Sequence, residues 1–252
     1  AMEMTKWFNT NYHYIVPELS RDVKFNLNSS KIIAEYKEAK EAGVLNAKIN
    51  LIGPITFLAL SKTTDGSNAL DHLDALSSEY VKLIAELSKL DNEIIIQIDE
   101  PIFVTDRAAE LASKIVPIYD SLASVADNVK IIFMTYFEHA NEAVAQVVKS
   151  KIWAIGLDFI HAACQEEALK LLSNSDKVLF AGLIDGRNVW VSNLDAKAEI
   201  ANKIKTFIPD ERLYIGTSCS LLHVPYTLKY EENLSIKEWL AFGVKKLTEL
   251  KI

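Results

Sequence analysis

The sequence predicts an α/β protein built around a parallel β-sheet, and two observations support this prediction. Short apolar runs rich in β-branched residues alternate with longer amphipathic stretches along the chain. These runs lack the period-two alternation of a sheet with one wet face, as expected for parallel strands covered on both faces. Repetition of a strand followed by a helix indicates right-handed βαβ units. The expected strands are Lys48–Ile52, Glu93–Asp99, Val129–Tyr136, Ile152–Asp158, Val178–Ile184 and Arg212–Thr217.

Helical patterns occupy the stretches between these strands. Ser235 and Glu238 have the spacing of a capping box, which places the start of the last helix. No linker rich in Pro, Gly or Ser divides the chain, so we expect one domain over residues 1–252. The expected helices are Ala69–Leu90, Arg107–Ala126, Asn141–Lys149, Gln165–Ser173, Ala196–Phe207 and Ser235–Leu250.

Six βα units fit either a doubly wound open sheet or part of a (β/α)8 barrel. The turn at Gly53-Pro54 lacks the glycine spacing of a phosphate-binding loop, and polar groups follow successive strands as they do around a barrel mouth. We therefore expect an incomplete TIM-type barrel of about six units plus an N-terminal aromatic hairpin, with two units missing at its start. Six strands cannot span the circumference of eight, so Lys48–Ile52 and Arg212–Thr217 should not pair with each other.

Composition narrows the class of protein. Half of the residues are hydrophobic and the net charge is −7, which favours a packed globular domain and argues against nucleic acid as a partner. No apolar run reaches the length of about 20 residues that a membrane span requires. The two cysteines, Cys164 and Cys219, are expected to be reduced thiols, and the protein is expected to be cytoplasmic.

Polar residues of unknown role are expected at the barrel mouth: Asp99, Glu100, Asp185, Arg187, Asn188, Ser218, Cys219 and His223. Asp99 and Glu100 could bind an amine or tune a proton transfer. Alternatively, they could cap neighbouring loops and pair with Arg107 or Arg187. Arg187 suits a carboxylate or phosphate; the alternative is an internal ion pair with Asp185 or Asp99.

Nucleophilic and metal chemistry have weaker support. Cys219 and His223 could form a nucleophilic pair, but both lie on one short loop with nothing obvious to orient the imidazole. No two histidines have metal-ligand spacing, so no metal site is expected in this chain.

The most distinctive segment is MTKWFNTNYHYIVPE, residues 4–18. Its aromatic residues suit a hairpin that closes one end of a barrel. Lys6, held among aromatic and amide side chains near the mouth, could also serve an anionic ligand.

These segments together resemble the family of cobalamin-independent methionine synthases. The matching stretches are EMTKWFNTNYHYIVPE, LIGPITFL, IQIDEP, TYF, GLIDGRNVW, SCSLLHVP and WLAF, which occur in this order over essentially the whole chain. The resemblance implies two facing (β/α)8 barrels, with zinc, homocysteine and the folate pterin bound chiefly by the C-terminal barrel. This chain resembles the N-terminal barrel from its third strand onward.

The resemblance also implies how the site residues divide between the two barrels. The positions of two zinc ligands fall here on Phe133 and Thr135, a third falls near Leu157 or Asp158, and only Cys219 retains a ligating atom. The chain should therefore lack catalytic residues and hold no zinc of its own, and Asp99 should not inherit the homocysteine contact of its counterpart. Lys6 matches a family lysine that contacts the triglutamate tail of methyltetrahydrofolate.

We therefore expect a scaffold and polyglutamate-tail site that is inactive alone. Its partners would be the C-terminal catalytic barrel of the same parent chain and methyltetrahydrofolate triglutamate, with neither nucleic acid nor membrane. Two alternatives remain: a stand-alone binding or scaffold protein derived from this barrel, and a small hydrolase using Asp99, Glu100 and Arg187.

Overall fold

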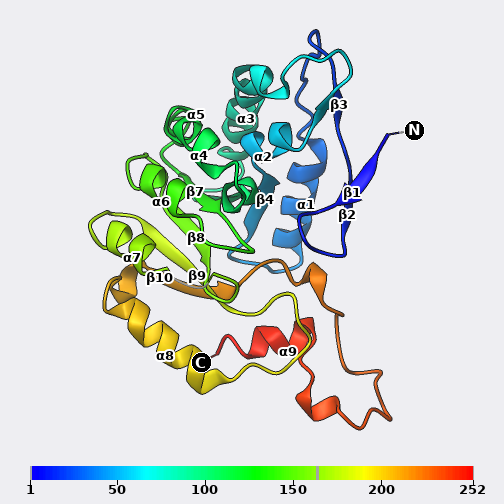
Figure 1. The fold of residues 1–252 in the computed structure, drawn as a ribbon, viewed down its shortest axis with the longest axis vertical. Helices are drawn as coiled ribbons and strands as arrows, with labels where there is room; N and C mark the ends of the chain where they lie inside the picture. Colours follow the sequence, from blue (N-terminus) through cyan, green and yellow to red (C-terminus); the bar gives the residue numbers. More distant parts are fainter. Residues whose placement is uncertain (1, 163–164, 252) are drawn as a thin grey trace.

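The computed structural model of the chain describes residues 2–162 and 165–251 (Figure 1). Cys164, for which a reduced thiol was expected, lies outside these residues. The central feature is a six-stranded sheet in which every pair of neighbours is parallel. Its strands, in spatial order, are β10 (Leu213–Thr217), β9 (Val178–Ile184), β8 (Ala154–Asp158), β7 (Val129–Met134), β6 (Ile94–Asp99) and β4 (Lys48–Ile52).

The strand order runs in one direction without reversal, which excludes the doubly wound alternative. A closed barrel is not present either: within the described chain β4 and β10 each pair with one neighbour only. The expectation that these two strands do not pair with each other is therefore confirmed. The sheet is nevertheless curved, because Lys48 Nζ on β4 lies 5.8 Å from the centre of the Phe180 ring on β9, four strands away.

Helices follow the strands around the outside of the curved sheet, as Figure 1 shows for α3 to α8. Alternate residues of β6, Ile94, Ile96 and Ile98, are fully buried in the main core cluster. Burial of each such side chain stabilises the fold by roughly 1.5–3 kcal/mol. The α-helices are α1 (Ser30–Glu41), α2 (Pro54–Ala59), α3 (Leu73–Leu87), α4 (Ala108–Leu111), α5 (Ile115–Ala123), α6 (Asn141–Val147), α7 (Glu166–Ser173), α8 (Leu194–Lys205) and α9 (Gly243–Thr248).

Short elements complete the described chain. The aromatic segment forms the predicted hairpin, in which β1 (Met4–Lys6) pairs antiparallel with β2 (His13–Ile15). A second small sheet joins β3 (Glu18–Leu19) in parallel with β5 (Lys62–Thr63). Six 3-10 turns are η1 (Ala69–His72), η2 (Pro101–Val104), η3 (Ala112–Lys114), η4 (Asp210–Arg212), η5 (Leu221–His223) and η6 (Lys237–Trp239). Among the described residues, no helix is both long and apolar enough to cross a bilayer.

The last predicted helix, Ser235–Leu250, is helical only in its second half, so its predicted start is wrong. Ser235 does not cap a helix: η6 forms only a single turn, and α9 begins at Gly243. Between them, Leu240 and Ala241 are buried and extended, and they pair with the segment around Trp190 through an antiparallel bridge and an Ala241 N to Val189 O hydrogen bond of 2.7 Å. Burial of this pair in an extended conformation overrides the local capping signal.

Two further helix predictions need correction. The stretch predicted as Arg107–Ala126 is divided into α4, η3 and α5, and the stretch predicted as Ala69–Leu90 begins as a 3-10 turn before α3. Helices α1 and α2 were not predicted. The strand predictions differ from the observed strands by two residues at most.

Candidate functional site

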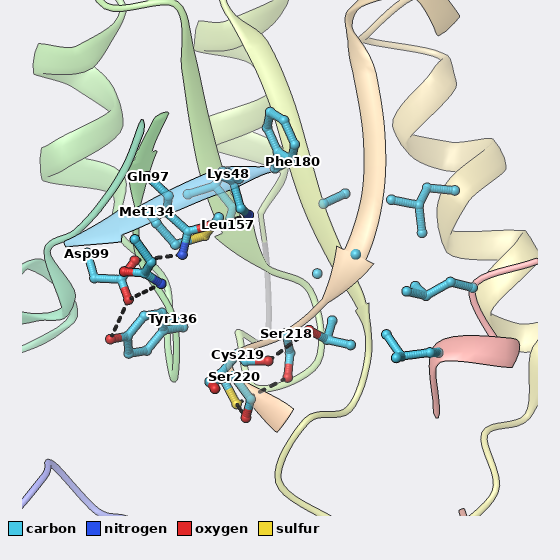
Figure 2. A pocket seen from close by; sticks show the side chains of 18 residues that line it. Lys48, Gln97, Asp99, Met134, Tyr136, Leu157, Phe180, Ser218, Cys219 and Ser220 are labelled. Carbon is cyan, nitrogen blue, oxygen red and sulfur yellow. Dashed lines mark hydrogen bonds between the residues drawn. The ribbon is translucent and has the colours of Figure 1, made fainter. Parts of the chain in front are cut away.

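The concave face of the sheet encloses an open cavity of about 390 Å³ (Figure 2). Its wall comes from β4, β6, β7, β8, β9 and β10, from the loop after β10, and from two leucines of the C-terminal segment. The polar side chains of this wall are Lys48, Asn50, Gln97, Asp99, Tyr136, Thr217, Ser218 and Ser220, with the thiol of Cys219.

Asp99 is the acidic residue of this wall. Its carboxylate accepts hydrogen bonds from Gln97 Nε2 at 2.7 Å, Tyr136 OH at 3.3 Å and Asn50 Nδ2 at 3.4 Å. Figure 2 shows the Gln97 and Tyr136 side chains on either side of the Asp99 carboxylate, with dashed lines for the hydrogen bonds. Burial raises the pKa of Asp99 to about 6, an effect that these hydrogen bonds and the nearby Lys48 ammonium oppose.

Lys48 introduces a cation into the same cavity. Its ammonium donates to Gln97 Oε1 and lies over the Phe180 ring. Burial lowers the pKa of Lys48, while Asp99 raises it. The Gln97 amide therefore links the Asp99 carboxylate to the Lys48 ammonium, and the three side chains form a polar network on the concave face of the sheet.

Glu100 faces away from this cavity. Its carboxylate is fully buried and accepts from Ile55 N (3.1 Å), Thr56 N (2.7 Å), Thr56 Oγ1 (2.5 Å) and Tyr119 OH (2.7 Å). The expected pair of carboxylates at the mouth is therefore not formed: Glu100 caps the N-terminus of α2, the capping alternative considered for it. The hydrolase alternative, which requires Asp99 and Glu100 on one face, loses its basis.

Asp158 lies at the end of β8 and is also fully buried. It accepts from the backbone N–H groups of Phe137, Ile160 and His161, and from His161 Nδ1 at 2.8 Å. The hydrogen bond to Asp158 raises the pKa of His161. Sequence reasoning did not single out Phe137, whose φ of 89° is rarely adopted by a non-glycine residue.

The loop after β9 is held partly by its own side chains. Asp185 accepts from Arg187 N at 2.8 Å and from Asn188 Nδ2 at 2.5 Å, which forms a closed turn. The Arg187 side chain instead donates to Asn9 Oδ1 (2.9 Å) and Asn9 O (3.0 Å) of the N-terminal hairpin. In the described chain Arg187 forms no ion pair with Asp185 or Asp99, and Arg107 pairs with Glu110, so those expected pairings are wrong.

The loop after β10 does not form a nucleophilic pair. Burial raises the pKa of Cys219 to about 12, so its thiol stays protonated at neutral pH. The His223 ring packs against Tyr12 and Phe137. Ser218 Oγ accepts from Gly186 N at 3.1 Å and thereby ties this loop to the loop after β9. Among the described residues, no three His, Cys, Asp or Glu side chains are grouped as a metal site would require.

Lys6 lies at the end of β1, where its side chain is exposed. The hairpin around it is braced by edge-to-face contacts of Trp7 with Phe8 and Tyr14, and by the Tyr12 hydroxyl, which donates to Leu222 O. Within the described chain the Lys6 ammonium makes no ion pair or hydrogen bond. Lys6 is therefore presented at the end of a braced hairpin, with its ammonium exposed.

The polar residues of the cavity wall that were missed include Lys48, Asn50 and Gln97. A signal for them exists in the sequence, because Lys48 and Asn50 are spaced two apart in β4, as are Gln97 and Asp99 in β6. Residues spaced two apart in a strand face the same side. Polar residues at that spacing within apolar strands mark the inner face of the sheet.

Comparisons with known proteins give a consistent family. The family model described as "Cobalamin-independent synthase, N-terminal domain" matches residues 1–209. The 5-methyltetrahydropteroyltriglutamate–homocysteine methyltransferase of Desulforamulus reducens is 48% identical and covers 99% of this chain, and that of Corynebacterium glutamicum is 42% identical and covers 100%. The chain spans about a third of the length of these relatives, 33% and 32%.

A solved structure, the B12-independent methionine synthase of Shewanella sp. W3-18-1 in complex with selenomethionine, shares the fold with a TM-score of 0.75. It is 17% identical in sequence, and the match covers 100% of this chain and 72% of that one. Because the family model matches most of the chain, the chain belongs to the cobalamin-independent synthase family and corresponds to the N-terminal domain of that family.

Proposed function

We propose that the chain is the non-catalytic part of a zinc-dependent methyltransferase that moves a methyl group from 5-methyltetrahydropteroyltriglutamate to homocysteine and so makes methionine. The observation that carries the proposal is the 48% identity, over nearly the whole chain, to a relative named for these two substrates. The catalytic barrel and its zinc would belong to the remaining two thirds of the parent protein, which would be cytoplasmic.

The residues at the positions of the family's zinc ligands support a scaffold role, because they do not fit a zinc ion. Phe133 is fully buried, with its ring 4.8 Å from that of Tyr119 and 5.6 Å from that of Phe103. Thr135 Oγ1 donates to Gly156 O at 3.0 Å, and Cys219 is a buried, protonated thiol. Zinc in proteins requires about four ligands, with cysteine as the thiolate. No zinc chemistry is therefore assigned to this chain.

The chain would act as a second wall of the substrate cleft. We interpret the six-stranded arc as part of an eight-stranded barrel and residues 1–252 as one domain, with the hairpin presenting Lys6 to the triglutamate tail. The exposed position of Lys6 and its unpaired ammonium support this role. A single exposed lysine–carboxylate pair contributes only about 0.2–1 kcal/mol, so the tail would need further contacts in the parent protein.

Two measurements on the purified 252-residue chain test the proposal. We expect no methionine from homocysteine and methyltetrahydrofolate triglutamate, because the catalytic barrel is absent. We expect weak, salt-sensitive binding of the triglutamate form and none of the monoglutamate form, since the contact is electrostatic. Methionine formation by this chain alone, or equal binding of both forms, would contradict the proposal.

The mass of the native gene product separates the parent enzyme from a stand-alone binding protein. The chain covers 33% of the Desulforamulus reducens relative. If the parent protein resembles this relative, the native gene product is about three times as long as the chain. A native mass of 28.2 kDa, that of the chain itself, would instead favour the stand-alone alternative.

A further inference from the structure

A second, smaller hollow lies between the N-terminal hairpin and two later loops. Its volume is about 100 Å³, and it shares none of its lining with the cavity on the concave face. Hydrogen bonds of Arg187 to Asn9 and of Tyr12 to Leu222 join the three segments around it. Its lining residues are Asn9, Thr10, Asn11, Tyr12, Arg187 and His223.

Arg187 brings a fixed positive charge to this hollow with donors to spare. A guanidinium has five N–H groups, and two of them are used by Asn9 Oδ1 and Asn9 O. The other three have no acceptor among the described residues. The Phe137 ring, 4.9 Å from the guanidinium carbon, supports the group from one side and fixes its orientation.

His223 adds a second group that can become cationic. Its ring stands edge-on to Tyr12, with 5.1 Å between ring centres, and to Phe137 at 5.8 Å. In the described chain its ring nitrogens have no hydrogen-bond partner. Burial and the Arg187 charge lower the pKa of His223, so a neighbouring anion would reverse part of that effect.

Among the described residues, no Asp or Glu lines the hollow, although the chain as a whole carries a net charge of −7. We propose that the hollow is a binding site for a small oxyanion, a carboxylate or phosphate group, held by Arg187 and His223 with the Asn11 amide beside them. The guanidinium fork matches the paired oxygens of such groups. The volume of about 100 Å³ equals that of about three water molecules, each of which takes about 30 Å³ in the liquid. The hollow therefore has room for one such group.

The oxyanion site does not depend on the proposed function if its ligand is a free phosphate, and it rests on that function if its ligand is a carboxylate of the glutamate tail. The anion could be a free phosphate or the carboxylate of a glutamate chain. Both present the same oxygens, and the two probes used below distinguish them.

The test follows the imidazole proton resonances of the five histidines of the 252-residue chain at low ionic strength. His223→Phe identifies the His223 signal and preserves the ring contacts with Tyr12 and Phe137. Inorganic phosphate and a γ-linked triglutamate peptide are titrated separately, with chloride as the control for ionic strength. We expect saturable binding that raises the pKa of His223, because an anion stabilises the charged imidazole.

Arg187→Gln should weaken binding about tenfold or more, since charge-assisted hydrogen bonds are lost. Lys31→Gln, at an exposed lysine of α1, removes the same charge elsewhere and should leave binding unchanged. Because Arg187→Gln also frees Asn9, His223→Phe serves as the second test and should weaken phosphate binding measured by phosphorus NMR.

Saturation by either probe supports the site and identifies the anion; saturation by both indicates a general oxyanion site. Responses no larger than that to chloride, or equal losses in Arg187→Gln and Lys31→Gln, would overturn it. Loss of triglutamate binding in Lys6→Ala with unchanged phosphate binding would separate this site from the proposed tail contact.

Discussion

Asp99 and Glu100 are neighbours in the chain, yet their carboxylates lie on opposite sides of the sheet. Asp99 faces the cavity and accepts from Gln97, Asn50 and Tyr136, whereas Glu100 faces the helices and accepts from α2 and from Tyr119. Successive side chains alternate across a strand, so adjacency in sequence separates the two acids in space. Asp99 therefore belongs to the polar cavity network, and Glu100 belongs to the packing of α2 and α5.

Tyr119→Phe tests the packing role of Glu100. The substitution removes one of four donors to a fully buried carboxylate. We expect a loss of about 1–3 kcal/mol in the free energy of unfolding at pH 8, where Glu100 carries its charge. Urea unfolding measures this value. Tyr226→Phe, at an exposed tyrosine, is the control and should leave stability unchanged; equal effects of the two variants would contradict the assignment.

Asp99→Asn should change how stability depends on pH. The pKa of Asp99 rises from 3.8 to about 6 on folding, so the native state holds its proton more tightly than the unfolded state does. The resulting stabilisation is complete below about pH 3.8 and is lost as the pH rises through 6. The wild-type chain should therefore lose stability relative to Asp99→Asn between about pH 4 and pH 6.

Glu100, with a pKa raised to about 7, produces a loss in the same direction in both chains, so the informative quantity is the difference between them. Urea unfolding at several pH values measures it. Asp127→Asn, at an exposed aspartate, provides the matched control. A constant difference between wild type and Asp99→Asn across the range would show that folding does not raise the pKa of Asp99.

Gly182→Ala tests how closely β9 and the loop after β10 approach each other. A Cβ at Gly182 would lie 2.6 Å from Ser218 Cα, a backbone atom that cannot move alone. We expect a loss of about 1–3 kcal/mol or more from the forced separation. Gly216→Ala, in the adjacent strand, meets nothing within 4 Å and is the control. Thermal unfolding should therefore distinguish the two variants; similar melting temperatures would show that the loop can yield.

Much of the fold could be predicted because parallel strands buried on both faces leave a strong local signal. The apolar run Val178–Ile184 forms β9 with the predicted bounds. Helix α1 also has a local signal that was missed: Ile32, Ile33 and Tyr36 lie on one face, and Gly43 follows the helix with a φ of 88°. The C-terminal segment could not be predicted, since Leu240 becomes extended through its pairing with Trp190, fifty residues earlier.

The candidate site could be predicted only in part. The carboxyl ends of parallel strands meet at one edge of a sheet, which brings Asp99, Asp158 and Ser218 to the same edge, at the ends of the alternate strands β6, β8 and β10. The partner of Arg187, in contrast, is Asn9, which lies 178 residues away. No local pattern relates these two residues, so the smaller hollow that they line becomes visible only in the folded chain.

Lys6→Ala, made in the intact parent enzyme, tests the proposed tail contact. An exposed lysine–carboxylate pair contributes about 0.2–1 kcal/mol, and a triglutamate tail offers several carboxylates. We therefore expect the KM for the triglutamate substrate to rise by about a factor of 2 to 10, since 1.4 kcal/mol corresponds to tenfold. The kcat should stay nearly unchanged, because the tail is remote from the transferred methyl group.

Two control variants separate tail binding from a structural role of Lys6. Lys6→Arg keeps the charge and should keep most of the affinity, whereas Lys31→Ala, at an exposed lysine of α1, should leave KM unchanged. The alternative is that the Lys6 stem packs on the aromatic residues of the hairpin. In that case Lys6→Ala would lower the melting temperature and leave the KM for the triglutamate substrate unaltered, and Lys6 would be a structural residue of the hairpin.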